Sequence, residues 1–347
     1  MSCRRVVFFI VAGFFLVSAF VYGAGSEVKG MDEPVVVKIK STLDGSDCPT
    51  YFYVPEVDDG AKIPLLVALH TWSYDYQARE PREWAFNECR NRKWAMLHPD
   101  FRGPNSSPKA CGSDYAVQDI LDAIEFAKAN APIDTDRIYL IGMSGGGMMS
   151  LLMAGRHPDI WAGVYSGCPI SDIARWHSDS VRLKNHGYAK QIEAACGGDP
   201  ADAVEEYRLR SPLTYLAAAR KNKVHIQIAT GIHDGHIGSV PVGHAIRAYN
   251  MLADDGDRIS EDDIAIIERE RKVPVSLQFD GSDPFFGPKL AIHLRKTSAN
   301  VRLTIFEGGH SGNFNAGIDW LARQRRGNTV DWTLPAVGDG AETHATK

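Results

Sequence analysis

The sequence lacks any long run of basic residues and carries only a small net charge. Its 38 Lys and Arg residues and 43 Asp and Glu residues leave a formal net charge of −5. Because phosphate binding requires clustered Lys and Arg, this composition argues against a nucleic-acid partner. Of the 347 residues, 44% are hydrophobic and 23% are charged, which is ordinary for a globular protein and argues against a disordered or fibrous chain.

Cysteine is scarce as well, with six residues in the whole chain. Cys3 comes too early to be a lipid-attachment cysteine. The other five leave at least one thiol without a partner in the chain; they are Cys48, Cys89, Cys111, Cys168 and Cys196. The candidate disulfides in an exported chain are Cys168–Cys196 and Cys89–Cys111. Buried free thiols are an equally weighted alternative.

The first residues differ in character from the rest of the chain. Arg4 and Arg5 precede an apolar run at 6–22, and small residues follow at 23–26. This order is typical of a secretory signal peptide. We therefore expect residues 1–24 to be removed and the protein to be secreted or periplasmic, without stable membrane association. A membrane anchor is the alternative, since about 17 apolar residues lie at the lower limit for a spanning helix.

Short β-branched runs alternate with helical patterns between residues 31 and 332. This alternation predicts an α/β domain with a mostly parallel sheet and helices on both faces. Strands are expected at 35–40, 51–54, 63–69, 94–97, 137–141, 161–165, 224–229 and 301–306. Helices are expected at 82–92, 115–129, 148–154, 213–219, 244–252 and 316–325. We interpret 173–210 and 255–300 as insertions, the second with a charged helix at 261–271, and 333–347 as a loose tail.

The most specific motif is Gly142-Met143-Ser144-Gly145-Gly146. It directly follows the apolar run 138–141 and precedes the helix-forming run 148–152. A Ser at the apex of a strand-to-helix turn is strained, and flanking glycines leave room for neighbouring backbone. The helix start also places N–H groups and a positive dipole end nearby. The motif predicts Ser144 as a nucleophile, and the alternative is a flexible Gly-rich turn.

A nucleophilic serine needs a base and an acid that orients the base. In a strand–turn–helix setting of this kind they follow in the order Ser, acid, His. His310 follows the last predicted strand. Asp234 follows the strand 224–229, at the carboxyl end where open α/β sheets bind ligands. Asp283 is the alternative acid, although its position before a proline favours a turn.

An acyl-transfer site also needs donors for a developing oxyanion. The backbone N–H of Gly145 is one candidate, and Thr71 or Trp72 supplies the other. We expect His70 to brace that loop rather than act as a base, and Arg102 to form a structural salt bridge. No metal is expected at His233, Asp234 and His236, because no further ligand falls at a familiar zinc spacing.

Several segments together resemble the catalytic domain of the prolyl oligopeptidase family and the secreted carbohydrate and feruloyl esterases that share it. They are the elbow at Ser144, Asp119 to Ala123, Arg210 to Thr214, Asp234 with Val240-Pro241, and Gly309-His310. The resemblance covers about 35–326 and implies the α/β-hydrolase fold, a triad of Ser144, Asp234 and His310, and no cofactor. His70-Thr71 stands where the family usually has His-Gly. Neither a propeller domain nor the paired glutamates of aminodipeptidases are evident.

The resemblance implies hydrolysis of acyl or aryl esters, either small molecules or esters linked to polysaccharide. A peptidase without a propeller domain would use the same residues and is the alternative. A binding module that has kept the fold without the chemistry is a third hypothesis. The presence of all three triad residues argues against that third hypothesis.

Overall fold

The computed structural model describes residues 30–334, so the predicted signal peptide and residues 335–347 of the predicted tail lie outside the described residues. The strands are β1 (Val35–Lys40), β2 (Asp47–Tyr53), β3 (Ile63–Leu69), β4 (Ala95–Pro99), β5 (Ile133–Met143), β6 (Gly163–Gly167), β7 (Ile226–Gly231), β8 (Ile292–Ser298) and β9 (Val301–Phe306). The helices are α1 (Arg79–Arg92), α2 (Asp114–Asn130), α3 (Gly145–Arg156), α4 (Ile173–Arg182), α5 (His186–Cys196), α6 (Val204–Leu209), α7 (Leu216–Lys221), α8 (Gly243–Leu252), α9 (Glu261–Glu270) and α10 (Phe314–Leu321).

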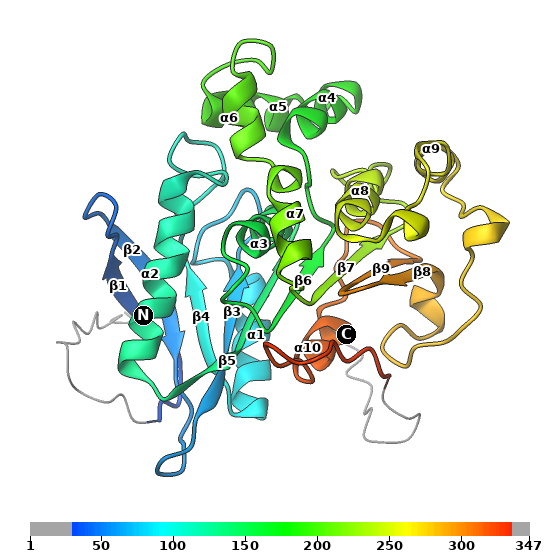
Figure 1. Cartoon of the computed structure of the whole chain (residues 1–347). Helices are drawn as coiled ribbons and strands as arrows, with labels where there is room; N and C mark the ends of the chain where they lie inside the picture. Colours follow the sequence, from blue (N-terminus) through cyan, green and yellow to red (C-terminus); the bar gives the residue numbers. More distant parts are fainter. Residues whose placement is uncertain (1–29, 335–347) are drawn as a thin grey trace, which may run out of the picture.

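One sheet forms the centre of the molecule, in the order β1-β2-β4-β3-β5-β6-β7-β9-β8 (Figure 1). In this order, the neighbouring strands β4, β3, β5, β6, β7 and β9 are all parallel to one another. At one edge β1 pairs with β2 and β2 with β4 in antiparallel fashion, and at the other edge β8 is antiparallel to β9. The expected α/β class with a mostly parallel sheet is confirmed. None of the helices within residues 30–334 is long and apolar enough to cross a membrane.

The central strand β3 is buried at every position, because helices cover both faces of the sheet. Successive side chains point to opposite faces. Leu65 and Val67 therefore pack in the core that includes residues of α2, α3 and α8. Leu66 and Ala68 pack in the core on the other side, with residues of α1 and α10.

The first expected insertion, 173–210, contains the helices α4, α5 and α6, which we call the cap. It begins shortly after β6 and lies beyond the carboxyl ends of the parallel strands (Figure 1). The cap thus covers the edge of the sheet where the loops carrying the candidate site residues emerge.

For the second expected insertion, 255–300, the predicted C-terminal part is wrong. Residues 292–298 form β8, which pairs antiparallel with β9 from Ile292↔Phe306 to Ser298↔Val301. The strand has only two buried residues, Leu294 and Ser298. Its apolar signal was therefore too weak for detection from the sequence, as is common for an edge strand that faces solvent.

The candidate disulfides are also wrong. All five cysteines in the described part of the chain are buried and unpaired, which agrees with the alternative of free thiols. Burial raises the pKa of the Cys48 thiol to about 12, and of the Cys196 thiol to about 11. These thiols are thus protonated and poor nucleophiles near neutral pH.

Candidate active site

Ser144 occupies the turn between β5 and α3 with a backbone geometry that non-glycine residues rarely adopt. Its φ is 59° and its ψ is −119°. A Cβ on Gly142 would lie 2.3 Å from the carbonyl oxygen of Gly146, and one on Gly145 would lie 2.6 Å from Trp72 Cα. The turn is therefore tightly packed on both sides. This packing disagrees with the alternative of a flexible glycine-rich turn.

Asp234 and His310 form a direct pair, with 2.7 Å between Asp234 Oδ2 and His310 Nδ1. The carboxyl group is fully buried. Its other oxygen, Oδ1, accepts the backbone N–H groups of Gly235 and Val240 at 2.9 and 3.2 Å. Because Nδ1 donates to the carboxylate, Nε2 keeps a lone pair and can accept a proton.

The loop that carries His310 packs against the elbow of Ser144. The backbone N–H of Ser144 donates to Gly167 O at 2.8 Å. A Cβ on Gly312 would lie 3.2 Å from Gly167 Cα. Cys168 Sγ donates to Ser311 O at 3.0 Å. The end of β6 thus holds the Ser144 turn and the His310 loop side by side, so the structure brings the predicted nucleophile and base to one edge of the sheet.

The alternative acid, Asp283, lies elsewhere. Its Oδ2 is 2.8 Å from Arg295 of β8, and its Oδ1 accepts the backbone N–H of Phe285 at 3.0 Å. The second contact is the turn geometry expected from the sequence. Asp283 therefore has a structural role at the edge of the sheet.

The candidate oxyanion donors are adjacent backbone amides. A Cβ on Gly145 would lie 2.6 Å from Trp72 N. Among residues 30–334, the backbone N–H groups of Gly145 and Trp72 have no hydrogen-bond acceptor. Of the two residues proposed for the second donor, Trp72 and not Thr71 is the one whose backbone meets Gly145. Two neighbouring backbone N–H groups without an acceptor, one of them on the residue after Ser144, suit a developing oxyanion.

Side chains of the cap hold Trp72 in place. Its Nε1 donates to Gln191 Oε1 of α5 at 2.7 Å. Its ring meets Trp176 of α4 edge to face, with 4.6 Å between ring centroids. His70, which precedes this loop, has its ring nitrogens 2.9 Å from Thr71 O and 2.8 Å from Asp100 O, as expected for a bracing residue.

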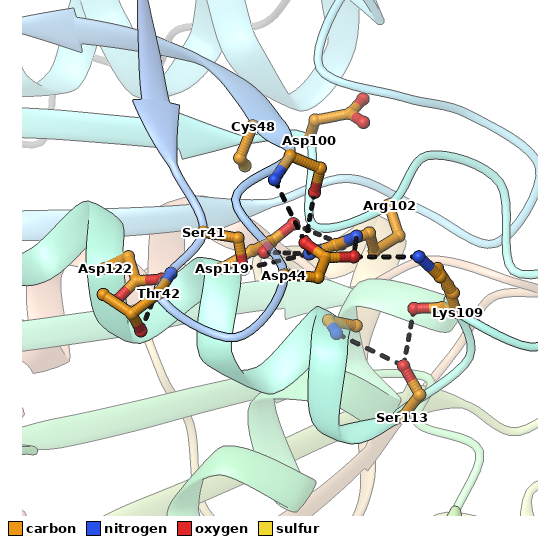
Figure 2. Close-up of polar contacts among 12 residues, drawn as sticks. Ser41, Thr42, Asp44, Cys48, Asp100, Arg102, Lys109, Ser113, Asp119 and Asp122 are labelled. Atoms are coloured by element: carbon orange, nitrogen blue, oxygen red, sulfur yellow. Dashed lines mark hydrogen bonds and ion pairs between the residues drawn. The ribbon is translucent and has the colours of Figure 1, made fainter.

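Arg102 forms the structural salt bridge that we expected. Figure 2 shows the carboxylate of Asp44 in contact with both the Arg102 guanidinium and the Lys109 ammonium group. Arg102 donates to both oxygens of Asp119 at 2.7 and 2.8 Å, and to Asp44 at 2.9 and 3.0 Å (Figure 2). These charge-assisted hydrogen bonds to two carboxylates give Arg102 a structural role.

The three residues considered for a metal site do not converge. Asp234 contacts His310, whereas His236 Nε2 lies 2.7 Å from Glu268 O. His233 Nε2 lies 2.7 Å from Glu307 Oε1. Each side chain thus has a different partner, and the three do not form a shared ligand set.

Glu307 is a site-supporting residue that the sequence analysis missed. It contacts His233 at 2.7 Å and His293 at 2.9 Å, and these hydrogen bonds lower the pKa of its carboxyl group. His233 directly precedes Asp234, and Glu307 lies just before the loop that carries His310. The contact between His233 and Glu307 therefore connects the loop of the acid Asp234 to the loop of the base His310. A charged residue directly before Gly308-Gly309-His310 was the only available signal.

Comparison with known proteins supports the fold. Residues 111–264 match the model of the prolyl oligopeptidase family (peptidase S9). The matched segment contains Ser144 and Asp234 and ends before His310. The resemblance found in the sequence is thereby confirmed, and the fold is the α/β-hydrolase fold of that family's catalytic domain.

Two curated proteins are similar over part of their length. Poly(3-hydroxyalkanoate) depolymerase C of Paucimonas lemoignei is 31% identical over 113 residues, 30% of this chain and 27% of that protein. Feruloyl esterase B of Thermothelomyces thermophilus is 25% identical over 174 residues, 46% of this chain and 59% of that protein. The chain thus spans less than two thirds of either relative.

Solved structures of peptidases and hydrolases share the fold. Pyrococcus horikoshii acylaminoacyl peptidase aligns with a TM-score of 0.57 at 18% identity, over 87% of this chain and 43% of that chain. A puromycin hydrolase aligns with a TM-score of 0.56 at 16% identity, over 83% of this chain and 37% of that chain. At such identities the likeness establishes the architecture alone.

Proposed function

We propose that this chain is a secreted serine hydrolase that cleaves acyl or aryl esters, carried by small molecules or by polysaccharide, without a cofactor. The observation that best supports serine hydrolysis is the hydrogen bond between the buried Asp234 carboxylate and His310, because the loop that carries His310 packs against the strained Ser144 turn. Export rests on the charge and hydropathy pattern of residues 1–24.

The geometry supports an acyl-enzyme mechanism. His310 Nε2 takes the proton of Ser144 Oγ as this oxygen attacks the substrate carbonyl carbon. Asp234 keeps Nδ1 protonated and stabilises the imidazolium that forms. The backbone N–H groups of Gly145 and Trp72 bind the oxyanion of the tetrahedral intermediate. His310 then protonates the departing alcohol, and a water molecule activated by His310 releases the acid and restores Ser144.

Ester rather than amide hydrolysis is supported by the two curated relatives, one named a depolymerase of a polyester and the other a feruloyl esterase. A serine peptidase is the second candidate, favoured by the match of residues 111–264 to the prolyl oligopeptidase family. Both reactions use the same triad, so only the substrate distinguishes them.

The test is hydrolysis of p-nitrophenyl acetate together with labelling by a fluorophosphonate probe. Ser144→Ala should abolish labelling and lower kcat by several orders of magnitude, because the triad acts as a unit. Ser178→Ala is the matched control, because Ser178 is an exposed serine of the cap, and it should label and turn over like wild type. Labelling of the Ser144→Ala variant at the wild-type level would contradict the assignment.

Paired substrates separate the two candidates. Esters without an activated leaving group, methyl ferulate and an acetylated sugar, should be hydrolysed, whereas peptidyl p-nitroanilides and short peptides should not be cleaved measurably. Faster cleavage of the anilides or of short peptides would make the chain a peptidase and leave the triad assignment intact.

A further inference from the structure

The cap carries a second cluster of potential metal ligands, away from Ser144. His177 of α4, Glu193 of α5 and Asp199 of the following loop each offer one ligand atom, and these atoms all lie within 4.8 Å of one another. His177 Nε2 is 2.8 Å from Glu193 Oε1. Three elements that follow one another in the chain therefore converge on one point.

The charge of this cluster is not balanced by the protein. Within the described residues, no Lys or Arg forms an ion pair with Glu193 or Asp199. The Asp199 carboxylate accepts the backbone N–H of Ala201 at 2.8 Å, and this is the sole hydrogen bond to its side chain in residues 30–334. A cation bound between the two carboxylates offsets their mutual repulsion.

The donor set selects the kind of cation. An imidazole nitrogen with two carboxylate oxygens suits divalent transition metals, whereas Ca²⁺ and Mg²⁺ take oxygen ligands. The side chain of His177 is 8% exposed and that of Glu193 is 39% exposed. The cluster is thus anchored from inside and open on one side, where an ion can enter and keep water ligands.

The ligand atoms, all within 4.8 Å of one another, can reach one ion by side-chain adjustment. Ligand atoms about 2.1 Å from Zn²⁺ in a tetrahedral site lie about 3.4 Å from one another. His177 Nε2 and Glu193 Oε1 must therefore separate by roughly half an ångström, as the ion takes the place of the shared proton. We propose that His177, Glu193 and Asp199 bind one divalent transition-metal ion, with Zn²⁺ as the best match and water completing its coordination.

An ion bound at this site would lie next to the two cap residues that support Trp72. His177 follows Trp176, and Glu193 lies two residues after Gln191 on α5. Trp176 and Gln191 are the cap residues that contact Trp72. An ion that joins α4, α5 and the loop after α5 therefore stiffens both supports of Trp72. This consequence for catalysis rests on the proposed function, whereas the binding of the ion does not.

Another cluster of potential ligands could also bind Zn²⁺, so the binding experiment needs a variant that lacks this other cluster. Ligand atoms of Cys168, Asp234 and His310 also lie within 4.8 Å of one another. His310 and Asp234 are already bonded to each other, but added Zn²⁺ can compete for them. His310→Ala deletes this cluster and leaves the cap unchanged, so the binding measurements use the full chain with this substitution.

Calorimetric titration with ZnCl₂ should give one ion per chain, and the melting temperature should rise with Zn²⁺ concentration by mass action. Adding Glu193→Gln and Asp199→Asn to the His310→Ala chain should weaken Zn²⁺ binding at least about 100-fold, because these substitutions remove both charged ligands. Asp202→Asn, an exposed neighbour in the same loop, is the matched control and should bind like its parent.

Two outcomes would overturn the proposal. One is the absence of Zn²⁺ binding, and the other is undiminished binding by the double variant. X-ray absorption of the Zn²⁺-loaded His310→Ala chain gives a readout that does not depend on how the double variant folds. It should show one imidazole nitrogen among oxygen ligands, whereas sulfur or several imidazoles would place the ion elsewhere. If the His310→Ala chain binds Zn²⁺ at the cap but the wild-type chain hydrolyses no ester, the proposed function is contradicted and the metal site is not.

Discussion

At the level of single residues, the triad pair depends on the absence of a side chain at Gly238. A Cβ there would lie 2.2 Å from Asp234 Oδ1 and 2.7 Å from His310 Cβ. Gly238→Ala should therefore displace the carboxylate from His310 Nδ1. We expect kcat for p-nitrophenyl acetate to fall at least about 100-fold with KM little changed, because the base loses its orientation.

The control for this prediction is Gly187→Ala. Gly187 belongs to α5, and a Cβ there would have open space within 4 Å. This variant should retain the wild-type kcat. If Gly238→Ala also kept the wild-type kcat, the Asp234–His310 contact would not be required for turnover.

Arg102 offers a test of stability at the same scale. It pairs with Asp119, whose side chain is 2% exposed. Arg102→Met should leave that carboxylate buried without a partner and lower the free energy of unfolding by about 3 kcal/mol, measured by urea titration. The double variant with Asp119→Leu should recover most of the loss, since the buried charge is then gone. A double variant no more stable than Arg102→Met would refute this explanation.

Residue by residue, the sequence predicted those parts of the site that are local in the chain. Ser144 lies in a motif whose strand and helix flank it directly, and His310 follows a clear strand. Glu307 contacts His233 and His293, which are distant from it in the sequence, so no local sequence pattern predicts these contacts. The choice of Trp72 over Thr71 likewise needed the backbone approach to Gly145.

At the level of elements, the cap couples to the oxyanion loop through two side chains. Gln191 accepts the indole N–H of Trp72, which is itself almost fully buried. Gln191→Leu has a similar volume and removes this acceptor. We expect kcat to fall about tenfold because the Trp72 amide is less well positioned, while the melting temperature changes by only a few degrees.

Lys190→Ala on the same helix is the comparison for this measurement, because Lys190 is exposed. It should change neither kcat nor the melting temperature appreciably. An equal loss of kcat in both variants would point to general loosening of α5 rather than to the Trp72 contact.

The elements predicted correctly are those with strong patterns. β3 is apolar throughout and matches its expected bounds, as do β1 and β9. β8 was missed because most of its residues are only partly buried and it includes the charged residues Arg295 and Lys296. Its place in the sheet is determined by pairing with β9, which is a tertiary contact.

For the molecule as a whole, two buried histidines connect stability to pH. His98 of β4 is fully buried, and its Nδ1 bonds to Ala68 O of β3 at 2.8 Å. Burial lowers the pKa of His98 from 6.5 to about 3, and it also lowers the pKa of His70. His98 is therefore neutral in the folded protein at pH 5 to 7 and charged at the lower end of that range when the chain unfolds, and the lowered pKa of His70 acts in the same direction.

The sign of the effect follows from proton binding. Below pH 6.5 the unfolded chain binds a proton at His98 that the folded protein rejects, so the free energy of unfolding decreases as the pH falls. Between pH 7 and pH 5 His98 alone accounts for a loss of about 2 kcal/mol. Burial raises the pKa of Asp100 to about 6, which acts in the opposite direction and offsets about 1 kcal/mol. The histidines dominate, so acid should destabilise the protein.

The measurement is urea unfolding at pH 7, 6 and 5 for wild type and His98→Gln. Gln keeps an N–H donor for Ala68 O and does not titrate. The variant is expected to be less stable at pH 7 because its packing is imperfect, yet its loss between pH 7 and pH 5 should be about 2 kcal/mol smaller than that of wild type. The difference between the two losses isolates His98, since Asp100 and His70 are common to both proteins. Equal losses would mean that His98 takes up a proton in the folded protein over this pH range, which would contradict the prediction.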